Sequence, residues 1–148
     1  MRALVQRVKM ARVCVDNTCI AEIGLGFLVL LGVARRDTMD DVRWVADKVG
    51  GLRIFADEHG KMGRSLSDVA GSVLVVSQFT LYGRVERGLR PDFVEAAPGA
   101  MALPLYEAFV ARLRDTGLKV VTGQFGAHME IQLINDGPVT MMIESRER

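Results

Sequence analysis

Two short apolar segments constrain the fold more than any other feature of this 148-residue chain. Phe27 to Val33 contains no polar side chain, and the interior of Ser72 to Ser77 is entirely apolar. Runs of this kind, bounded by turn residues, are typical of strands that are buried on both faces. Both segments are therefore predicted to be interior strands.

Alternating runs that are separated by turn residues predict the other strands. They cover residues 2–9, 12–15, 18–23, 52–55, 118–122, 129–135 and 139–144. Asp16-Asn17 is expected to form a two-residue hairpin turn, which places Cys14 opposite Cys19. Asp136-Gly137-Pro138 is expected to separate the last two strands.

Two segments have the spacing of amphipathic helices. Thr38 is predicted to cap the first, which Gly50-Gly51 ends and whose apolar face consists of Val42, Val45, Ala46 and Val49. The second covers about 103 to 116, with Pro104 in its first turn and an apolar face of Leu105, Phe109 and Leu113. The order of elements predicts an α+β fold in one domain, residues 1–148, with a barrel-like, mostly antiparallel sheet on which two long helices pack.

The net charge of +1 is too small for the whole molecule to attract a nucleic acid strongly. Any RNA must then be held by a local basic patch, and the densest one is Arg84, Arg87 and Arg90. Lys61 and Arg64 are candidates to extend it. The alternative interpretation of this segment is an ordinary solvated loop.

The longest apolar run, Ile23 to Ala34, is 12 residues long and is interrupted by glycines, so no membrane span is expected. The first residues alternate apolar with basic side chains and do not resemble a signal peptide. These features predict a cytoplasmic protein. In that reducing compartment Cys14 and Cys19 are expected to be free thiols.

Sequence motifs of cofactor and metal chemistry are missing. Gly24-Leu25-Gly26 lacks the third glycine of a dinucleotide fingerprint, and His128-Met129-Glu130 is not followed by the cysteine pair of a zinc deaminase. There is also no nucleophile elbow, and the chain has only two histidines to act as a base. No cofactor, no metal and no serine-type triad are therefore expected.

Two segments place polar or conformationally special residues where strands end. They are Ser77-Gln78-Phe79-Thr80-Leu81 and Asn135-Asp136-Gly137-Pro138-Val139-Thr140, and together they resemble the two signature motifs of the D-aminoacyl-tRNA deacylase family. Further similar segments are Arg2 to Val8, Gly88 to Phe93 and Thr122 to Ala127. The chain departs from the family's usual residues at Arg87, Asp92 and Pro104.

The resemblance implies an editing hydrolase that cleaves the ester of D-aminoacyl-tRNA, and of mischarged glycyl-tRNA, to release the amino acid and tRNA. It implies a catalytic segment of Ser77, Gln78, Phe79 and Thr80 that receives the acceptor end. It also implies a homodimer in which a cis Gly137-Pro138 pair enters the partner's active site. There its carbonyl oxygens would occupy the space of an L side chain, so that L-amino acids are rejected by exclusion.

The ester is labile enough that positioning suffices, and the resemblance implies that the substrate's 2′-hydroxyl assists the attacking water. Thr80 is an alternative nucleophile, but such a role needs an activating base that the sequence does not show. Ser77, Gln78 and Thr80 also fit a structural role, satisfying backbone groups at a strand end. Two other functions stay open: a nucleic-acid-binding module without turnover, and a threonine hydrolase of small esters.

Overall fold

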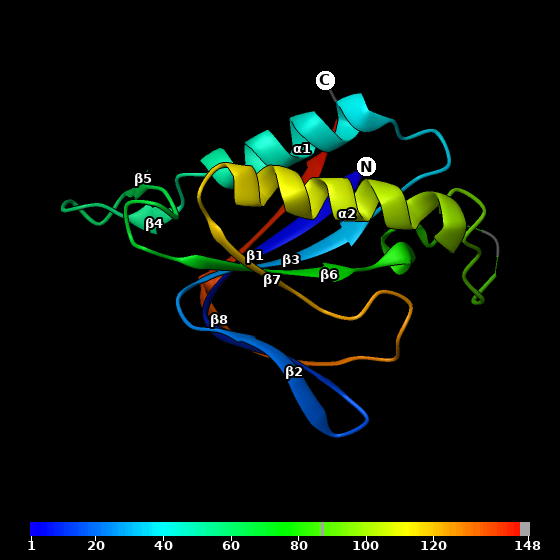
Figure 1. Cartoon of the computed structure of the whole chain (residues 1–148), viewed down its shortest axis with the longest axis horizontal. Helices are drawn as coiled ribbons and strands as arrows, with labels where there is room; N and C mark the ends of the chain where they lie inside the picture. The colour runs from blue at the N-terminus through cyan, green and yellow to red at the C-terminus, as the bar shows by residue number, and fades with distance from the viewer. Residues whose placement is uncertain (87, 146–148) are drawn as a thin grey trace.

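The computed structural model describes residues 1–86 and 88–145, in which two α-helices lie side by side over a curled six-stranded sheet (Figure 1). The strands of this sheet are β1 (Arg2–Val15), β2 (Thr18–Ile23), β3 (Gly26–Gly32), β6 (Ser72–Ser77), β7 (Lys119–Thr122) and β8 (Glu130–Glu144). The helices are α1 (Met39–Gly51), α2 (Gly99–Asp115) and a short 3-10 helix, η1 (Phe79–Tyr82). A separate hairpin consists of β4 (Phe55–Ala56) and β5 (Met62–Arg64).

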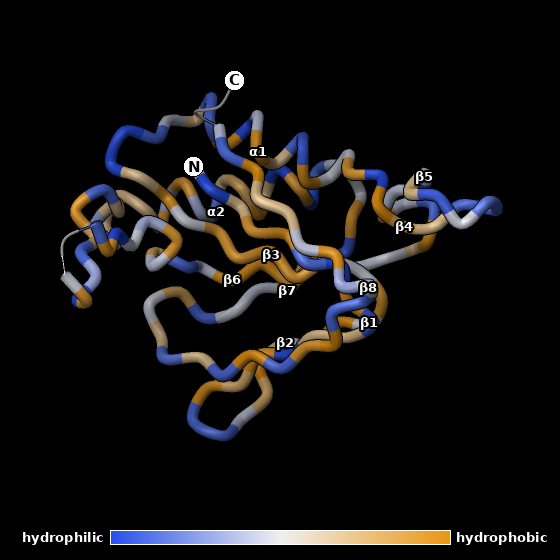
Figure 2. The backbone as a smooth tube through the Cα atoms, turned by 180° about the vertical axis from the view of Figure 1, so that it is seen from behind, coloured by the Kyte–Doolittle hydropathy of each residue, from blue (hydrophilic) through white to orange (hydrophobic). Residues whose placement is uncertain are grey.

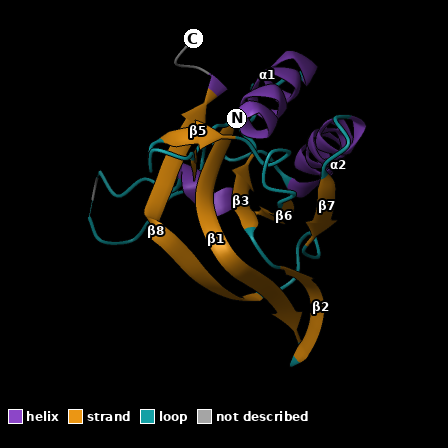
Figure 3. Ribbon diagram, turned by 90° about the vertical axis from the view of Figure 1, so that its left-hand side faces the viewer, coloured by secondary structure: helices purple, strands orange, loops and turns teal. Residues whose placement is uncertain are grey.

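The sheet has the order β2-β1-β3-β6-β7, and β8 pairs with the other edge of β1. Pairings of β1 with β2, β3 and β8 are antiparallel, whereas β3–β6 and β6–β7 are parallel. The long strand β1 pairs with β3 in its first half and with β2 in its second half. Its curvature brings β2 back towards β6 and β7, so the sheet is barrel-like (Figure 3). The predicted fold class is confirmed.

Strands β3 and β6 are buried on both faces, as the two apolar segments predict. Phe27, Val29 and Leu31 of β3 face the core beneath the helices, and Leu28 faces a second core inside the curl of the sheet. Val75 and Val76 of β6 divide between the two cores in the same way. The hydropathy colouring shows this central part of the sheet as continuous apolar chain (Figure 2).

Helix α1 begins and packs as predicted. The Thr38 side chain accepts a hydrogen bond from the backbone of Asp40, and the Asp41 carboxylate accepts one from the Thr38 backbone at 2.8 Å. This capping box satisfies backbone N–H groups that the first turn leaves without helical partners. The buried residues of α1 are the four that the periodicity identifies: Val42, Val45, Ala46 and Val49.

The predicted break at Asp136-Gly137-Pro138 is wrong, because β8 continues through these residues. Gln6 faces Thr140 and Val8 faces Asn135, so five residue steps on β8 oppose two on β1. The segment is thus a bulge within a paired strand, not a hairpin turn. Pairing along both long strands overrides the local turn signals, and it also removes the predicted interruption of β1 at residues 10–11.

The predicted start of the second helix is also wrong. Helix α2 begins at Gly99, four residues earlier than expected, and Pro104 lies inside it. Pro104 and Ala100 are exposed, so water can bind the Ala100 carbonyl that receives no N–H from proline. In the part of the chain that the structure describes, neither α-helix is long and apolar enough to cross a membrane.

Local differences also occur in the shorter strands. The predicted strand at 52–55 forms only from Phe55, and β5 was not expected. The hairpin turn is confirmed, with φ of 49° at Asp16 and 63° at Asn17. Cys14 faces Cys19 across it, and both thiols are free, as expected.

The Met1 amino group ties the two ends of the described chain together. It is fully buried, and it donates to Asp37 Oδ1 at 2.7 Å and to Ser145 Oγ at 2.8 Å. Asp37 is 1% exposed and also accepts from the Ala34 backbone at 2.6 Å. The buried ammonium group therefore has a charged partner at the junction of β3, α1 and the end of β8.

Candidate functional site

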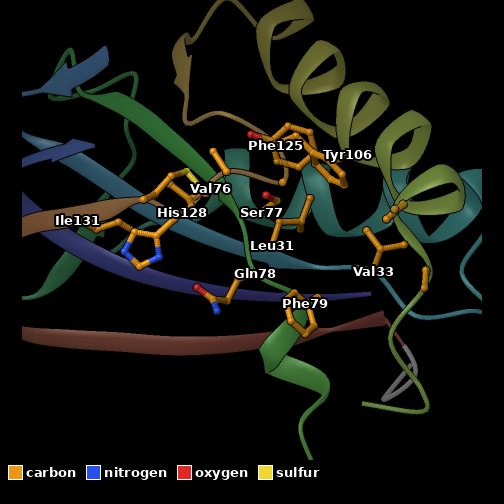
Figure 4. A pocket seen from close by; sticks show the side chains of 16 residues that line it. Leu31, Val33, Val76, Ser77, Gln78, Phe79, Tyr106, Phe125, His128 and Ile131 are labelled. Atoms are coloured by element: carbon orange, nitrogen blue, oxygen red, sulfur yellow. The ribbon is translucent and has the colours of Figure 1, made fainter. Parts of the chain in front are cut away.

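A cavity of about 510 Å³ opens beside the ends of β3 and β6, under the first turns of α2 (Figure 4). Its wall is mainly apolar, and its polar side chains come from Ser77, Gln78, Tyr106 and His128. The loop from β7 to β8 closes one side with residues 125–129. Its volume lies within the roughly 300–1,000 Å³ typical of small-ligand sites.

The structure brings three of the four predicted catalytic residues to this cavity. Ser77, Gln78 and Phe79 line it directly, where β6 ends and η1 begins. Hydrogen bonding of the Gln78 backbone N–H to the Leu31 carbonyl, at 2.8 Å, holds this segment against β3. Thr80 is exposed and is not among the lining residues, but its hydroxyl accepts a hydrogen bond from the Gln78 side-chain amide.

The start of η1 presents backbone donors next to the cavity. The N–H groups of Phe79 and Thr80 have no hydrogen-bond acceptor within residues 1–86 and 88–145, and no side chain caps this helix. Unpaired N–H groups at the beginning of a helical turn carry partial positive charge. This end of the cavity is therefore suited to bind an oxyanion.

Phe79 forms the rim of the cavity and does not belong to the core. Its side chain is 57% exposed and meets Phe93 edge to face, with ring centroids 5.0 Å apart. A Cβ at Gly83 would lie 2.9 Å from the Phe93 ring, so glycine is needed for Phe93 to pack this closely. The exposed aromatic ring thus has a supported position from which it can contact a bound molecule.

Tyr106 and Phe125 form the aromatic wall of the cavity, with ring centroids 5.5 Å apart (Figure 4). The Tyr106 hydroxyl donates to the Val75 carbonyl at 3.0 Å, and burial raises the pKa of this phenol to about 12. No function is predicted from the sequence for either residue or for His128. Phe125 lies in one of the family-like segments, whereas the helical spacing of Tyr106 indicates only burial.

The Gly137-Pro138 peptide bond is cis, and Gly137 has a φ of 132°. The segment is adjacent to Arg7, whose Nε donates to the Asp136 carbonyl at 3.1 Å and lies 3.4 Å from its carboxylate. At the start of β1, Arg2 donates to the Leu81 carbonyl of η1. Arg2 and Arg7 are five residues apart, or about 17 Å along a strand. Gly137-Pro138 thus lies away from η1 of its own chain and does not line the cavity.

The structure describes two of the three arginines of the predicted basic patch. Arg84 forms an ion pair with Glu95 at 2.6 Å, Arg90 is exposed, and Arg87 lies outside the described residues. Lys61 and Arg64 belong to the β4–β5 hairpin, at the opposite end of the molecule from the 84–90 loop, so they do not extend the patch (Figure 1).

Asp92 has a structural role in this loop. Its carboxylate accepts from the Val94 backbone at 3.2 Å, and its own backbone pairs with that of Arg84 in both directions at 2.9 Å. Aspartate therefore stabilises the loop that carries the arginines, although it adds negative charge there.

The sequence matches a protein family and several relatives over nearly its whole length. The family described as D-Tyr-tRNA(Tyr) deacylase matches residues 4–144. A D-aminoacyl-tRNA deacylase of Thermotoga petrophila is 57% identical over 145 residues, which cover 98% of this chain and 97% of that protein. That of Exiguobacterium sibiricum is 56% identical over 144 residues, covering 97% of this chain and 99% of its own.

Two solved structures have the same fold. One, described as c-Myc DNA Unwinding Element Binding Protein, has a TM-score of 0.91 at 42% identity and covers 98% of this chain and 99% of its own. The other, described as a probable eukaryotic D-amino acid tRNA deacylase, has a TM-score of 0.83 at 19% identity and covers 96% of this chain and 97% of its own.

Proposed function

This chain belongs to the D-Tyr-tRNA(Tyr) deacylase family, and we propose that it hydrolyses the ester of D-aminoacyl-tRNA to free D-amino acid and tRNA. The observation that carries the proposal is the cavity at Ser77, Gln78 and Phe79, which combines an apolar wall with unpaired backbone donors. Such an enzyme removes wrongly attached amino acids and so proofreads translation. We propose that it acts in the cytoplasm, where aminoacyl-tRNA is used, and that residues 1–148 act as one domain.

The proposed reaction needs positioning more than a protein nucleophile. A water oxygen attacks the ester carbonyl carbon, and the N–H groups of Phe79 and Thr80 stabilise the oxyanion that forms. The bond to the 3′ oxygen of the terminal ribose then breaks, and that oxygen takes up a proton as it leaves. The neighbouring 2′-hydroxyl orients the water and relays its proton, so the RNA assists its own deacylation.

Thr80 is assigned as a positioning residue. Its hydroxyl accepts the Gln78 amide, and in the described ranges no imidazole or carboxylate forms a hydrogen bond with it. A threonine nucleophile needs such a base to remove its proton. The Gln78–Thr80 contact instead stabilises the orientation of η1 and of its backbone donors.

A homodimer would bring Gly137-Pro138 to the cavity of the other subunit. Strand β8 pairs only with β1 among the described strands, so its second edge is open. Ile134 and Met142 of β8 are 53% and 47% exposed, which is unfavourable for apolar side chains unless a surface covers them. We propose that a second copy covers this strand, and that its Gly137-Pro138 pair excludes L side chains while accepting D-amino acids and glycine.

The decisive assay measures release of D-tyrosine, L-tyrosine and glycine from charged tRNA, with and without EDTA. We expect the D-tyrosyl and glycyl esters to be cleaved, the L-tyrosyl ester to persist, and the chelator to have no effect. Comparable cleavage of D- and L-tyrosyl-tRNA would refute the function. A 2′-deoxy terminal ribose should slow the reaction strongly, and full activity on that substrate, or complete loss with EDTA, would refute the mechanism.

A nucleic-acid-binding module is the alternative that a specific observation favours, because the 42% identical structure is described as a DNA-binding protein. Under that hypothesis the chain binds nucleic acid but releases no amino acid. In our proposal Arg84, Arg87 and Arg90 contact phosphates of the acceptor stem, so binding and turnover occur together. The same assay distinguishes the two functions.

A further inference from the structure

A second hollow of about 310 Å³ lies next to the cavity described above. Tyr106 and Phe125 line both spaces, so this aromatic pair is the wall between them. The hollow is bounded by α2 on one side and by the end of β7 with residue 123 on the other. The two spaces are therefore immediate neighbours that share one aromatic wall.

The second hollow has its own set of polar groups. Glu107 and Arg114 of α2 and Thr122 of β7 line it together with the two aromatic rings. Arg114 donates through Nε and Nη2 to the Val120 carbonyl at 3.4 and 3.2 Å, which fixes the guanidinium at the wall. Neither Glu107 nor Arg114 forms a salt bridge within the described part of the chain, so both charges are available to a ligand.

We propose that this second hollow binds the cytidine that precedes the terminal adenosine in the tRNA acceptor end. The inference rests on the proposed function, which places the terminal aminoacyl-adenosine in the first cavity. Single-stranded RNA is recognised by stacking of bases on aromatic side chains and by hydrogen bonds to their edges. Consecutive nucleotides then lie on either side of the Tyr106–Phe125 wall.

The charges in the hollow favour cytosine over uracil. The Glu107 carboxylate only accepts hydrogen bonds, and cytosine offers an N4 amino group, whereas uracil presents an oxygen at that position. Arg114 is two helical turns from Glu107, about 10.5 Å along α2, a separation over which a nucleotide extends from base edge to phosphate. The guanidinium is thus placed to bind the phosphate while Glu107 contacts the base.

Short substrates test this site without the rest of the tRNA. Hydrolysis would be measured for D-tyrosine esterified to adenosine, to cytidylyl-adenosine and to uridylyl-adenosine. We expect the cytidylyl ester to have a kcat/KM about tenfold above the other two, mainly through KM. Glu107→Gln should reduce the preference for cytidine over uridine to near unity, because its amide also donates to the uracil oxygen.

Arg114→Ala should raise KM for both dinucleotide esters and leave the adenosine ester unchanged. Arg112→Ala is the matched control, because Arg112 lies on the same helix but pairs with Asp47 of α1 at 2.8 Å. Equal rates for cytidylyl and uridylyl esters in the wild type, or equal losses in the two arginine variants, would overturn the inference. D-tyrosyl-tRNA is assayed beside the short esters: if the wild type does not cleave it, the proposed function fails, whereas cleavage of the tRNA with no preference for the cytidylyl ester overturns the inference alone.

Discussion

Tyr106→Phe offers a quantitative test of the aromatic wall, since it removes one buried hydroxyl and keeps the ring. The hydroxyl donates to the Val75 carbonyl, but that carbonyl also accepts from the Gly123 backbone at 3.0 Å. Because the acceptor keeps a partner in the variant, the loss at neutral pH should be small, about 0.5–1 kcal/mol of the free energy of unfolding.

The effect of this substitution should reverse in alkaline solution. Burial raises the pKa of Tyr106 from 10.0 to about 12, so folding favours the protonated phenol. The resulting stabilisation is complete below pH 10 and is lost as the pH rises towards 12. At about 1.4 kcal/mol per pKa unit, the wild type should lose roughly 2–3 kcal/mol that the phenylalanine variant does not lose. The variant should therefore become the more stable protein near pH 11.

Urea unfolding of both proteins at pH 8, 10 and 11 measures this difference. The other tyrosine, Tyr82, is present in both, so its titration and those of the lysines cancel in the comparison. A difference in stability that stays constant from pH 8 to 11 would show that Tyr106 is not desolvated as the structure indicates. At neutral pH the variant should retain deacylation, because the ring still separates the two hollows.

Three further substitutions probe the ends of the molecule and its RNA contact. Gly137→Ala should reduce deacylation by more than its loss of stability explains, because this pair is proposed to contact the substrate in the partner's cavity. Some stability is lost as well, since a Cβ at φ 132° would lie 2.7 Å from Val139 Cγ2; rates and unfolding midpoints that fall in proportion would contradict the proposed contact. Asp37→Ala removes the carboxylate that pairs with the buried Met1 ammonium and should cost about 3–5 kcal/mol in urea unfolding, so a loss under 1 kcal/mol would be incompatible with the buried pair. Arg90→Ala should weaken tRNA binding and lower the slope of its salt dependence by about one, with the preference for D-amino acids unchanged; an unaltered slope would remove Arg90 from the phosphate contacts.

Features that depend on near neighbours in the chain could be predicted from the sequence. Thr38 and the spacing from Val42 to Val49 define α1, because capping and amphipathic packing are set within a few residues. The apolar segments of β3 and β6 identify the central strands for the same reason. The polar side chains that directly follow a buried strand also predict a site at residues 77–80, and three of these residues line the cavity.

Features that depend on distant pairing were decided by the tertiary structure. Asp136-Gly137-Pro138 has the composition of a turn, yet pairing of β8 with β1 on both sides of it converts the turn into a bulge. Local propensities are worth tenths of a kcal/mol to about 1 kcal/mol per residue, so two long paired strands outweigh them. The aromatic wall has the same origin: Tyr106 and Phe125 come from different elements and meet only because α2 packs across β6 and β7. The sequence alone therefore determined the elements, the central strands and the family-like segments, whereas packing between distant segments decided which side chains enclose the site.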